Sequence, residues 1–215
     1  MSNPESFIDE VTEEVRRDRL FLMLRRYGWI GVLLVVAIVG GAAFNEWQKA
    51  KAQAEAQAFG DALMAGLEAE TPEARRAALA AVSASGEKAA VLNLLLASDP
   101  AEDRAASLAA LDKVVADAGL PVIWRDLAQL RRVMLAGADM PAADRRAALE
   151  PMAQPGHPYR TLAAEQLAYL LAEEGKTAEA ITALQALLED QDAPGGLRSR
   201  AAQMIVALGG EPKQG

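Results

Sequence analysis

The longest apolar stretch in the chain runs from Tyr27 to Phe44, where eighteen residues carry no charged side chain. At 1.5 Å of rise per helical residue, a helix of this length with its flanking residues covers roughly 27 to 32 Å, which matches the hydrocarbon core of a bilayer. Tyr27, Trp29 and Trp47 lie near its ends, where aromatic side chains favour the headgroup region. The pattern predicts a transmembrane helix over residues 27–47.

A cleaved signal peptide is the alternative for this stretch, because the small residues at 41–43 resemble a cleavage site. A signal peptide, however, has a short basic start and an apolar region of about 7 to 15 residues. Here 26 residues of mixed charge precede the stretch. A buried helix of a soluble protein seldom has so long a run without charge. The sequence therefore favours an uncleaved anchor.

Basic residues are unevenly distributed around the predicted span. Only Lys49 and Lys51 follow it closely, whereas five arginines precede it: Arg16, Arg17, Arg19, Arg25 and Arg26. Basic residues are retained on the cytoplasmic side, and acidic residues have little influence on this preference. We therefore expect a cytoplasmic N-terminus at the inner membrane, with residues 48–215 outside the cytoplasm, in the periplasm if the source is a Gram-negative bacterium.

The N-terminal segment has its own amphipathic pattern. Phe7, Ile8, Val11 and Val15 share one face of a predicted helix, and residues 20–24 are apolar between arginines. Such a helix has affinity for the membrane surface, with its basic side chains near anionic headgroups. We interpret residues 1–26 as a surface helix, and a docking site for a cytoplasmic partner is the alternative.

Beyond the span, capping residues and glycines divide the chain into short helices. Thr71-Pro72 and Asp99-Pro100 place a capping residue before a proline, and Glu102 completes a capping-box-like arrangement with Asp99. Recurrent glycines mark helix ends or turns. The predicted helices cover residues 48–70, 72–84, 87–97, 101–118, 120–137, 141–153, 158–174, 176–191 and 195–208. The connections are short, so we expect neighbouring helices to pack antiparallel.

Composition supports an all-α class, because alanine, leucine and glutamate dominate and only 5% of residues are aromatic. The chain has no cysteine, which excludes disulfides, thiolate zinc sites, cysteine nucleophiles and the acylated cysteine of lipoproteins. The net charge is −8, of which residues 1–26 carry −1. The strongly acidic remainder disfavours nucleic acid as a partner.

Catalytic motifs are missing from the sequence. No dinucleotide, phosphate-loop, nucleophile-elbow or zinc-protease pattern is present, and the single histidine, His157, lies in a Pro-Gly-His-Pro turn. The acid pairs Glu13-Glu14 and Glu173-Glu174 fit solvated helix faces, because adjacent helical residues point in different directions. We predict no enzymatic activity, no catalytic or metal-binding residue and no cofactor.

Other conspicuous residues have structural interpretations. In the acidic body, arginine pairs favour ion pairs on helix surfaces over phosphate binding. These pairs are Arg75-Arg76, Arg131-Arg132 and Arg145-Arg146. Trp124 has Leu127, Leu130 and Val133 or Met134 at helical spacings, which favours core packing, with a partner-binding anchor as the alternative. The sequence singles out no binding residue.

Residues 160–194 resemble a tetratricopeptide repeat. Leu167, Ala168 and Leu171 match the large, small and large positions of its first helix, and Ala180, Leu184 and Leu187 match its second helix. Ala164 occupies the usual tryptophan position, and the terminal proline comes late, at Pro194. A weaker unit covers residues 121–152. The resemblance implies an α-solenoid, in which stacked helix pairs form an extended binding surface.

The order of parts along the chain resembles the YfgM-like family, ancillary subunits of the SecYEG translocon. The resemblance rests on the amphipathic start FIDEVTEEVRRDRLFLMLRRYGWIGVLLVVAIVGG, the alanine-rich helix that follows and the divergent helical repeats. It implies an inner-membrane anchor with a periplasmic tetratricopeptide-like domain, whose partners are the translocon, periplasmic chaperones and proteins emerging from the channel.

Three regions and three hypotheses follow. The regions are a cytoplasmic segment (1–26), a span in contact with the bilayer (27–47) and a periplasmic helical-repeat domain (48–215). The leading hypothesis is a membrane-anchored, non-enzymatic adaptor that binds proteins during export. The alternative is a scaffold for envelope assembly, such as cell division, cell-wall synthesis or cytochrome maturation. A membrane-bound hydrolase with an unfamiliar site is the third, disfavoured by the lack of motifs.

Overall fold

The computed structural model describes residues 4–99, 101 and 103–212, with side chains described from Phe21 onward except those of Leu22 and Leu24. These residues form nine α-helices and one 3-10 turn and contain no strand, so the predicted all-α class is confirmed. The chain divides into two compact units, Met1–Gly60 and Asp61–Gly215. Each unit is described by itself below.

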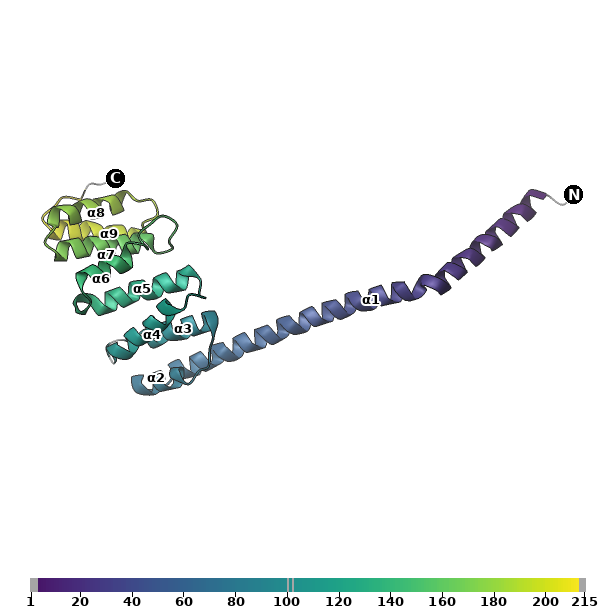
Figure 1. The fold of residues 1–215 in the computed structure, drawn as a ribbon, viewed down its shortest axis with the longest axis horizontal. Helices are drawn as coiled ribbons and strands as arrows, with labels where there is room; N and C mark the ends of the chain where they lie inside the picture. Colours follow the sequence, from purple (N-terminus) through teal and green to yellow (C-terminus); the bar gives the residue numbers. More distant parts are fainter. Residues whose placement is uncertain (1–3, 100, 102, 213–215) are drawn as a thin grey trace. The chain divides into compact units, whose positions relative to one another are not determined.

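The described residues of the first unit, 4–60, lie in one helix, which continues to Leu67 in the second unit. Helix α1 (Pro4–Leu67) runs without interruption through the boundaries expected after residues 26 and 47 (Figure 1). No proline occurs between residues 5 and 67, and residues 48–58 are mainly alanine, glutamine and lysine, which are strong helix formers. Nothing in the local sequence ends the helix at residue 47, so the helix predicted over residues 48–70 continues the predicted span without interruption.

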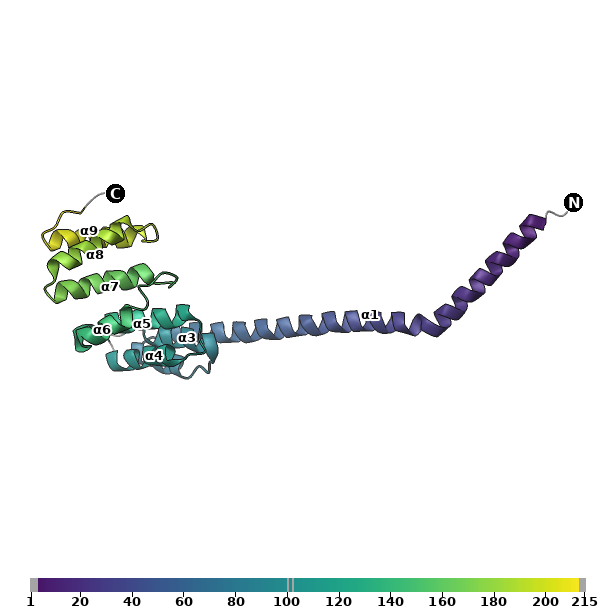
Figure 2. The same cartoon turned by 45° about the horizontal axis from the view of Figure 1, so that its top comes forward.

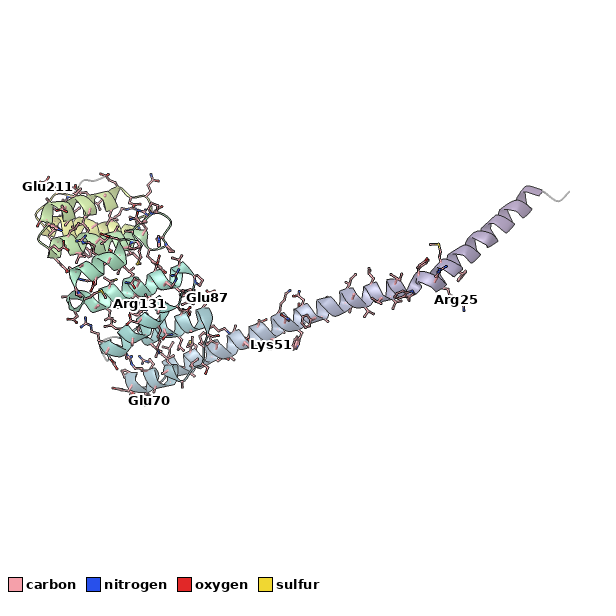
Figure 3. The ribbon with its side chains drawn as sticks, viewed as in Figure 1. Arg25, Lys51, Glu70, Glu87, Arg131 and Glu211 are labelled. Atoms are coloured by element: carbon pink, nitrogen blue, oxygen red, sulfur yellow. The ribbon has the colours of Figure 1, made fainter. Side chains whose placement is uncertain are left out.

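The apolar part of α1 is exposed. Among the described residues, one helical segment, Arg25–Leu67, is long and apolar enough to cross a membrane, and none of its most apolar window is buried. Arg25 lies before the charge-free residues 27–44 and Lys51 lies after them on the same helix (Figure 3). A row of exposed valines, leucines and isoleucines is costly in water, whereas in a bilayer the same surface is stabilising.

The second unit is a stack of helices, in which each helix packs mainly against its neighbours in sequence (Figures 1 and 2). Contacts also join α3 to α5 and α7 to α9. The elements are α2 (Pro72–Ala80), α3 (Gly86–Leu96), α4 (Arg104–Ala116), α5 (Val122–Ala136), the 3-10 turn η1 (Gly137–Asp139), α6 (Ala142–Leu149), α7 (Arg160–Glu173), α8 (Thr177–Glu189) and α9 (Gly195–Ala207).

Three clusters of buried side chains follow one another through the stack. The first joins α3, α4 and α5 around Leu111 and Val114. The second joins α5, α6 and α7 around Leu149. The third joins α7, α8 and α9 around Leu184 and Ile205. Each cluster includes fully buried alanines, whose small side chains let neighbouring helices approach closely.

Helix boundaries follow the capping chemistry, with one correction. Thr71 caps α2 as predicted, because its hydroxyl accepts a hydrogen bond from the Ala74 N–H at 3.2 Å. The start predicted at residue 101 is wrong: α4 begins at Arg104, and the cap is Asp103, whose carboxylate accepts from the Ala106 N–H at 2.8 Å. The capping box predicted with Pro100 and Glu102 lies outside the described residues.

The helix predicted over residues 72–84 also ends early. Helix α2 stops at Ala80, and the chain then runs to Ser85, an extended residue at the N-cap of α3. Gly137 and Gly175 have φ values of +51° and +76°, a left-handed conformation that favours glycine, and each lies at a helix end as predicted.

Candidate protein-binding surface

Helix α5 carries most of the exposed apolar side chains of the second unit. Among the described residues from 61 onward, five large apolar residues are exposed, and Val122, Ile123 and Met134 of these lie on α5. Ile123 and Met134 are 46% and 57% exposed. Apolar side chains that cluster on one helix, rather than scatter singly, are typical of a surface that contacts another molecule.

Ile123 and Met134 lie on the same side of α5. They are eleven residues apart, which is about three helical turns and about 16 Å along the axis. Leu127 and Leu130 lie between them on this side and are partly or fully covered by the first two core clusters. We define Ile123, Met134 and the cavity described next as the α5 surface.

A cavity of about 140 Å³ opens beside Met134, where α5, α6 and α7 meet. Its walls combine apolar side chains with the Gln166 amide, which can bond a peptide group. Arg145 and Glu173 form an ion pair of 2.7 Å and both line the cavity. The lining residues are Val133, Met134, Gly137, Arg145, Leu149, Gln166, Tyr169, Leu170 and Glu173.

Tyr169 is held in the wall of this cavity by a buried carboxylate. Its hydroxyl donates to Glu165 at 2.9 Å, and Arg200 on α9 donates to the two Glu165 oxygens at 2.9 and 2.7 Å. Burial raises the pKa of Tyr169, and the Glu165 hydrogen bond raises it further. The hydrogen bond to Glu165 raises the pKa of Arg200. The network therefore fixes the tyrosine ring and joins α7 to α9.

Trp124 is half-buried, so it packs against the core as predicted and also leaves part of its side chain at the surface. Its ring packs against the first core cluster, while its indole N–H donates to Glu87 on α3 at 2.8 Å. Figure 3 labels Glu87 on α3 and Arg131 on α5. The indole therefore helps to attach α5 to α3, beside the exposed Ile123.

His157 is more than a solvated turn residue. It lies in the predicted turn, between α6 and α7, but its Nδ1 is 2.6 Å from a carboxylate oxygen of Asp126, a buried residue of α5. The partners are 31 residues apart, so no local pattern could have indicated the contact. The pair ties the turn to α5, and we assign it no catalytic role.

The arginine pairs have mixed roles. Arg145 and Arg146 form ion pairs with Glu173 and Glu174, as the interpretation of surface ion pairs expects, and Arg132 pairs with Asp112. Arg131 instead donates to the carbonyls of Leu94 and Ala97, at the end of α3, at 3.0 and 2.9 Å. Carbonyls at a helix C-terminus lack hydrogen-bond donors within the helix, and the Arg131 guanidinium supplies these donors.

Arg104 does the same for the end of α5. Its guanidinium donates to the carbonyls of Leu135 and Ala136, both at 2.7 Å, and it pairs with Asp139. Arginine-to-carbonyl bonds thus join α3 to α5 and α4 to α5, in addition to the apolar packing between these helices. Of the two acid pairs predicted on solvated helix faces, Glu173 and Glu174 form the ion pairs described above, and the side chains of Glu13 and Glu14 lie outside the described residues.

A charged clamp at the start of α7 gives a pH-dependent prediction. Arg160 donates to both oxygens of Asp190 at 2.7 and 2.9 Å and to Asp192 at 2.9 Å. The Arg160 guanidinium lowers the pKa of Asp190. Because the folded-state pKa lies below the unfolded value, the clamp stabilises the fold above the unfolded pKa, and this stability is lost as the pH falls through the folded pKa.

We therefore expect Asp190→Asn to lower the free energy of unfolding by about 1–2 kcal/mol at pH 7. The difference from the wild type should shrink as the pH falls below about 4, the ordinary pKa of an aspartate, towards the lowered folded-state pKa of Asp190. Urea unfolding of the full chain in mild detergent, followed by circular dichroism, measures both. Asp192→Asn, at a more exposed position, should cost less. A difference that stays constant from pH 7 to pH 3 would contradict the clamp.

No protein-family model, curated protein or solved structure matches this chain. The resemblances to tetratricopeptide repeats and to the YfgM-like family therefore stay predictions.

Proposed function

We propose that this protein is a membrane-anchored, non-enzymatic adaptor whose helical body binds polypeptide segments during export. The body lies in the periplasm, the N-terminus lies in the cytoplasm, and the span holds the chain in the bacterial inner membrane. Its partners are the translocon, periplasmic chaperones and exported proteins, as in the YfgM-like family. The observation that carries the proposal is the α5 surface, on a chain with a helix long and apolar enough to cross a membrane.

The α5 surface has the chemistry that an extended polypeptide requires. Met134 is flexible and polarisable, so it adapts to apolar side chains of different shape. Gln166 offers both a donor and an acceptor for a peptide group in the same cavity. The contacts from α3 to α5 and from α7 to α9 support a tetratricopeptide-like arrangement, in which alternate helices line one face.

The first test places a photocrosslinking residue at Met134 or Ile123 of the full-length protein, in cells with an intact envelope. We expect capture of translocon subunits, chaperones or exported proteins. The matched control is Lys113, an exposed residue of α4. Capture of cell-wall, division or cytochrome-maturation proteins would support the scaffold hypothesis instead. Equal capture from all three positions would refute a specific α5 surface.

Met134→Glu should reduce co-purification of the captured partner in mild detergent by about tenfold, because it places a charge where an apolar side chain is buried on binding. Lys113→Glu adds negative charge elsewhere and should leave co-purification unchanged. If both variants behave alike, the loss reflects net charge rather than the α5 surface.

Orientation is tested independently by protease digestion of spheroplasts that contain the protein with a tag at each end. We expect digestion of the body and protection of the N-terminal tag, because the arginines before the span favour the cytoplasmic side. Protection of the body would place it in the cytoplasm and exclude a role in the periplasm.

A further inference from the structure

A second, chemically different cavity lies within the second unit, where the end of α1, α2 and α3 meet. Its volume is about 70 Å³. Leucines and a proline form most of its lining, and two arginines of α2 join them. The lining residues are Leu67, Pro72, Arg75, Arg76, Leu79, Leu95, Leu96, Ser98 and Asp99.

The two arginines have donors without acceptors. The Nε atoms of Arg75 and Arg76 are buried, and neither has a hydrogen-bond partner among the described residues. Arg76 is anchored through its Nη2, which donates to the Asp99 main-chain carbonyl at 3.1 Å. Buried donors without acceptors are destabilising, so a pair of them in one cavity indicates that an acceptor binds there.

The guanidinium group determines which acceptor fits. Its Nε–H and one Nη–H are parallel and match the two oxygens of a carboxylate. The surrounding leucines favour an aliphatic group next to that carboxylate. The cavity is lined by two arginines and one acidic residue, Asp99, so the charge of its lining favours a carboxylate.

We propose that this cavity binds a peptide carboxylate that lies next to an aliphatic side chain. The carboxylate comes from a glutamate or aspartate side chain or from a peptide C-terminus. The inference rests on the proposed function, since the ligand is a polypeptide, but the cavity is formed by other helices than the α5 surface. Arg75 is the main ligand, because Arg76 is partly engaged by Asp99.

The experiment titrates the full-length protein in mild detergent with fluorescent N-terminally blocked peptides. The probes are trileucine with a free C-terminal carboxylate, trileucine amide, Leu-Leu-Glu amide and Leu-Leu-Gln amide. We expect the carboxylate peptides to bind at least tenfold more tightly than their neutral counterparts. Preference for the free C-terminus or for the glutamate side chain identifies the source of the carboxylate. Equal affinity for acidic and neutral peptides would overturn the proposal.

Variants then locate the site. Arg75→Met should weaken binding of the carboxylate peptides at least tenfold, Arg75→Lys should retain part of it, and Lys113→Met removes a surface charge as the control. Unfolding curves of each variant show whether the fold is retained. Unchanged affinity in Arg75→Met would refute this cavity as the site. Met134→Glu should leave binding of these peptides unchanged, so failure of the α5 surface and failure of this cavity give different results.

Discussion

Arg200→Met should be among the most destabilising single substitutions in the helical body. Glu165 is only 2% exposed, and Arg200 supplies two of the three side-chain hydrogen bonds that its carboxylate accepts. Without Arg200, the charge stays buried with Tyr169 as its remaining side-chain donor. Removing one partner of a buried ion pair costs about 3–5 kcal/mol, but Arg200 is half-exposed and water can partly replace it, so we expect about 2–3 kcal/mol.

The double variant Glu165→Met with Arg200→Met distinguishes two causes of destabilisation: loss of the ion pair itself, and a buried Glu165 charge left without Arg200. It removes both charges and should recover most of the stability, because a buried ion pair is often replaced by apolar side chains at little cost. Urea unfolding of the full chain in mild detergent measures the free energy of unfolding of each variant. If Arg200→Met is as stable as Arg198→Met, an exposed arginine on the same helix, then Glu165 does not depend on Arg200.

The same substitution connects stability with binding. Tyr169 lines the cavity beside Met134, and its hydroxyl is oriented by Glu165. Arg200 supplies two of the hydrogen bonds that hold the Glu165 carboxylate in place, so without Arg200 the Glu165–Tyr169 hydrogen bond fixes the tyrosine ring less firmly. We therefore expect Arg200→Met to weaken partner capture through Met134 even at temperatures where the body stays folded.

The helices of the second unit were predictable because their signals are local. The repeat-like region was predicted as helices 158–174, 176–191 and 195–208, and α7, α8 and α9 lie within these ranges. Glycine and proline end helices through the backbone itself, whatever the tertiary contacts. The error at α4 has the same origin: Asp99 and Asp103 are both good caps, and Asp103 forms the observed hydrogen bond.

The α5 surface was only partly visible in the sequence. Helical spacing grouped Trp124, Leu127, Leu130 and Val133 or Met134 as one apolar face, and these residues were expected to pack in the core. Val133 does so, but Met134 is exposed. Adjacent side chains point in directions 100° apart on a helix, and of these two only Val133 is covered by neighbouring helices. Which of them faces solvent depends on the position of α6 and α7, which local sequence does not encode.

The polar network was not predictable at all. Glu165 and Arg200 are 35 residues apart, and Glu165 lies in a helix where a glutamate normally indicates a solvated position. Asp126 and His157 are similarly distant. Such pairs depend on which helices the stack brings together, so their only sequence signal is a charged residue at an otherwise buried helical position.

Two arginines in the centre of the predicted span should abolish membrane integration. At the middle of a membrane helix each arginine costs about 2.5–3.5 kcal/mol, so Val35→Arg with Val39→Arg costs about 5–7 kcal/mol. The residues are exposed in the described helix, which leaves no other part of this unit to bury the new charges. We expect the variant to pass from the membrane pellet to the soluble fraction after alkaline carbonate extraction.

The control for this variant places the same pair of charges on the same helix but outside the predicted span. Ala52→Arg with Ala56→Arg keeps the four-residue spacing and lies in the exposed, alanine-rich part of α1 after Lys51. Because these positions are expected in water, the variant should stay in the membrane pellet as the wild type does. Release of both variants would mean that the bilayer extends further along α1 than residue 47. Retention of the Val35 and Val39 variant would mean that residues 27–47 do not hold this protein in the membrane.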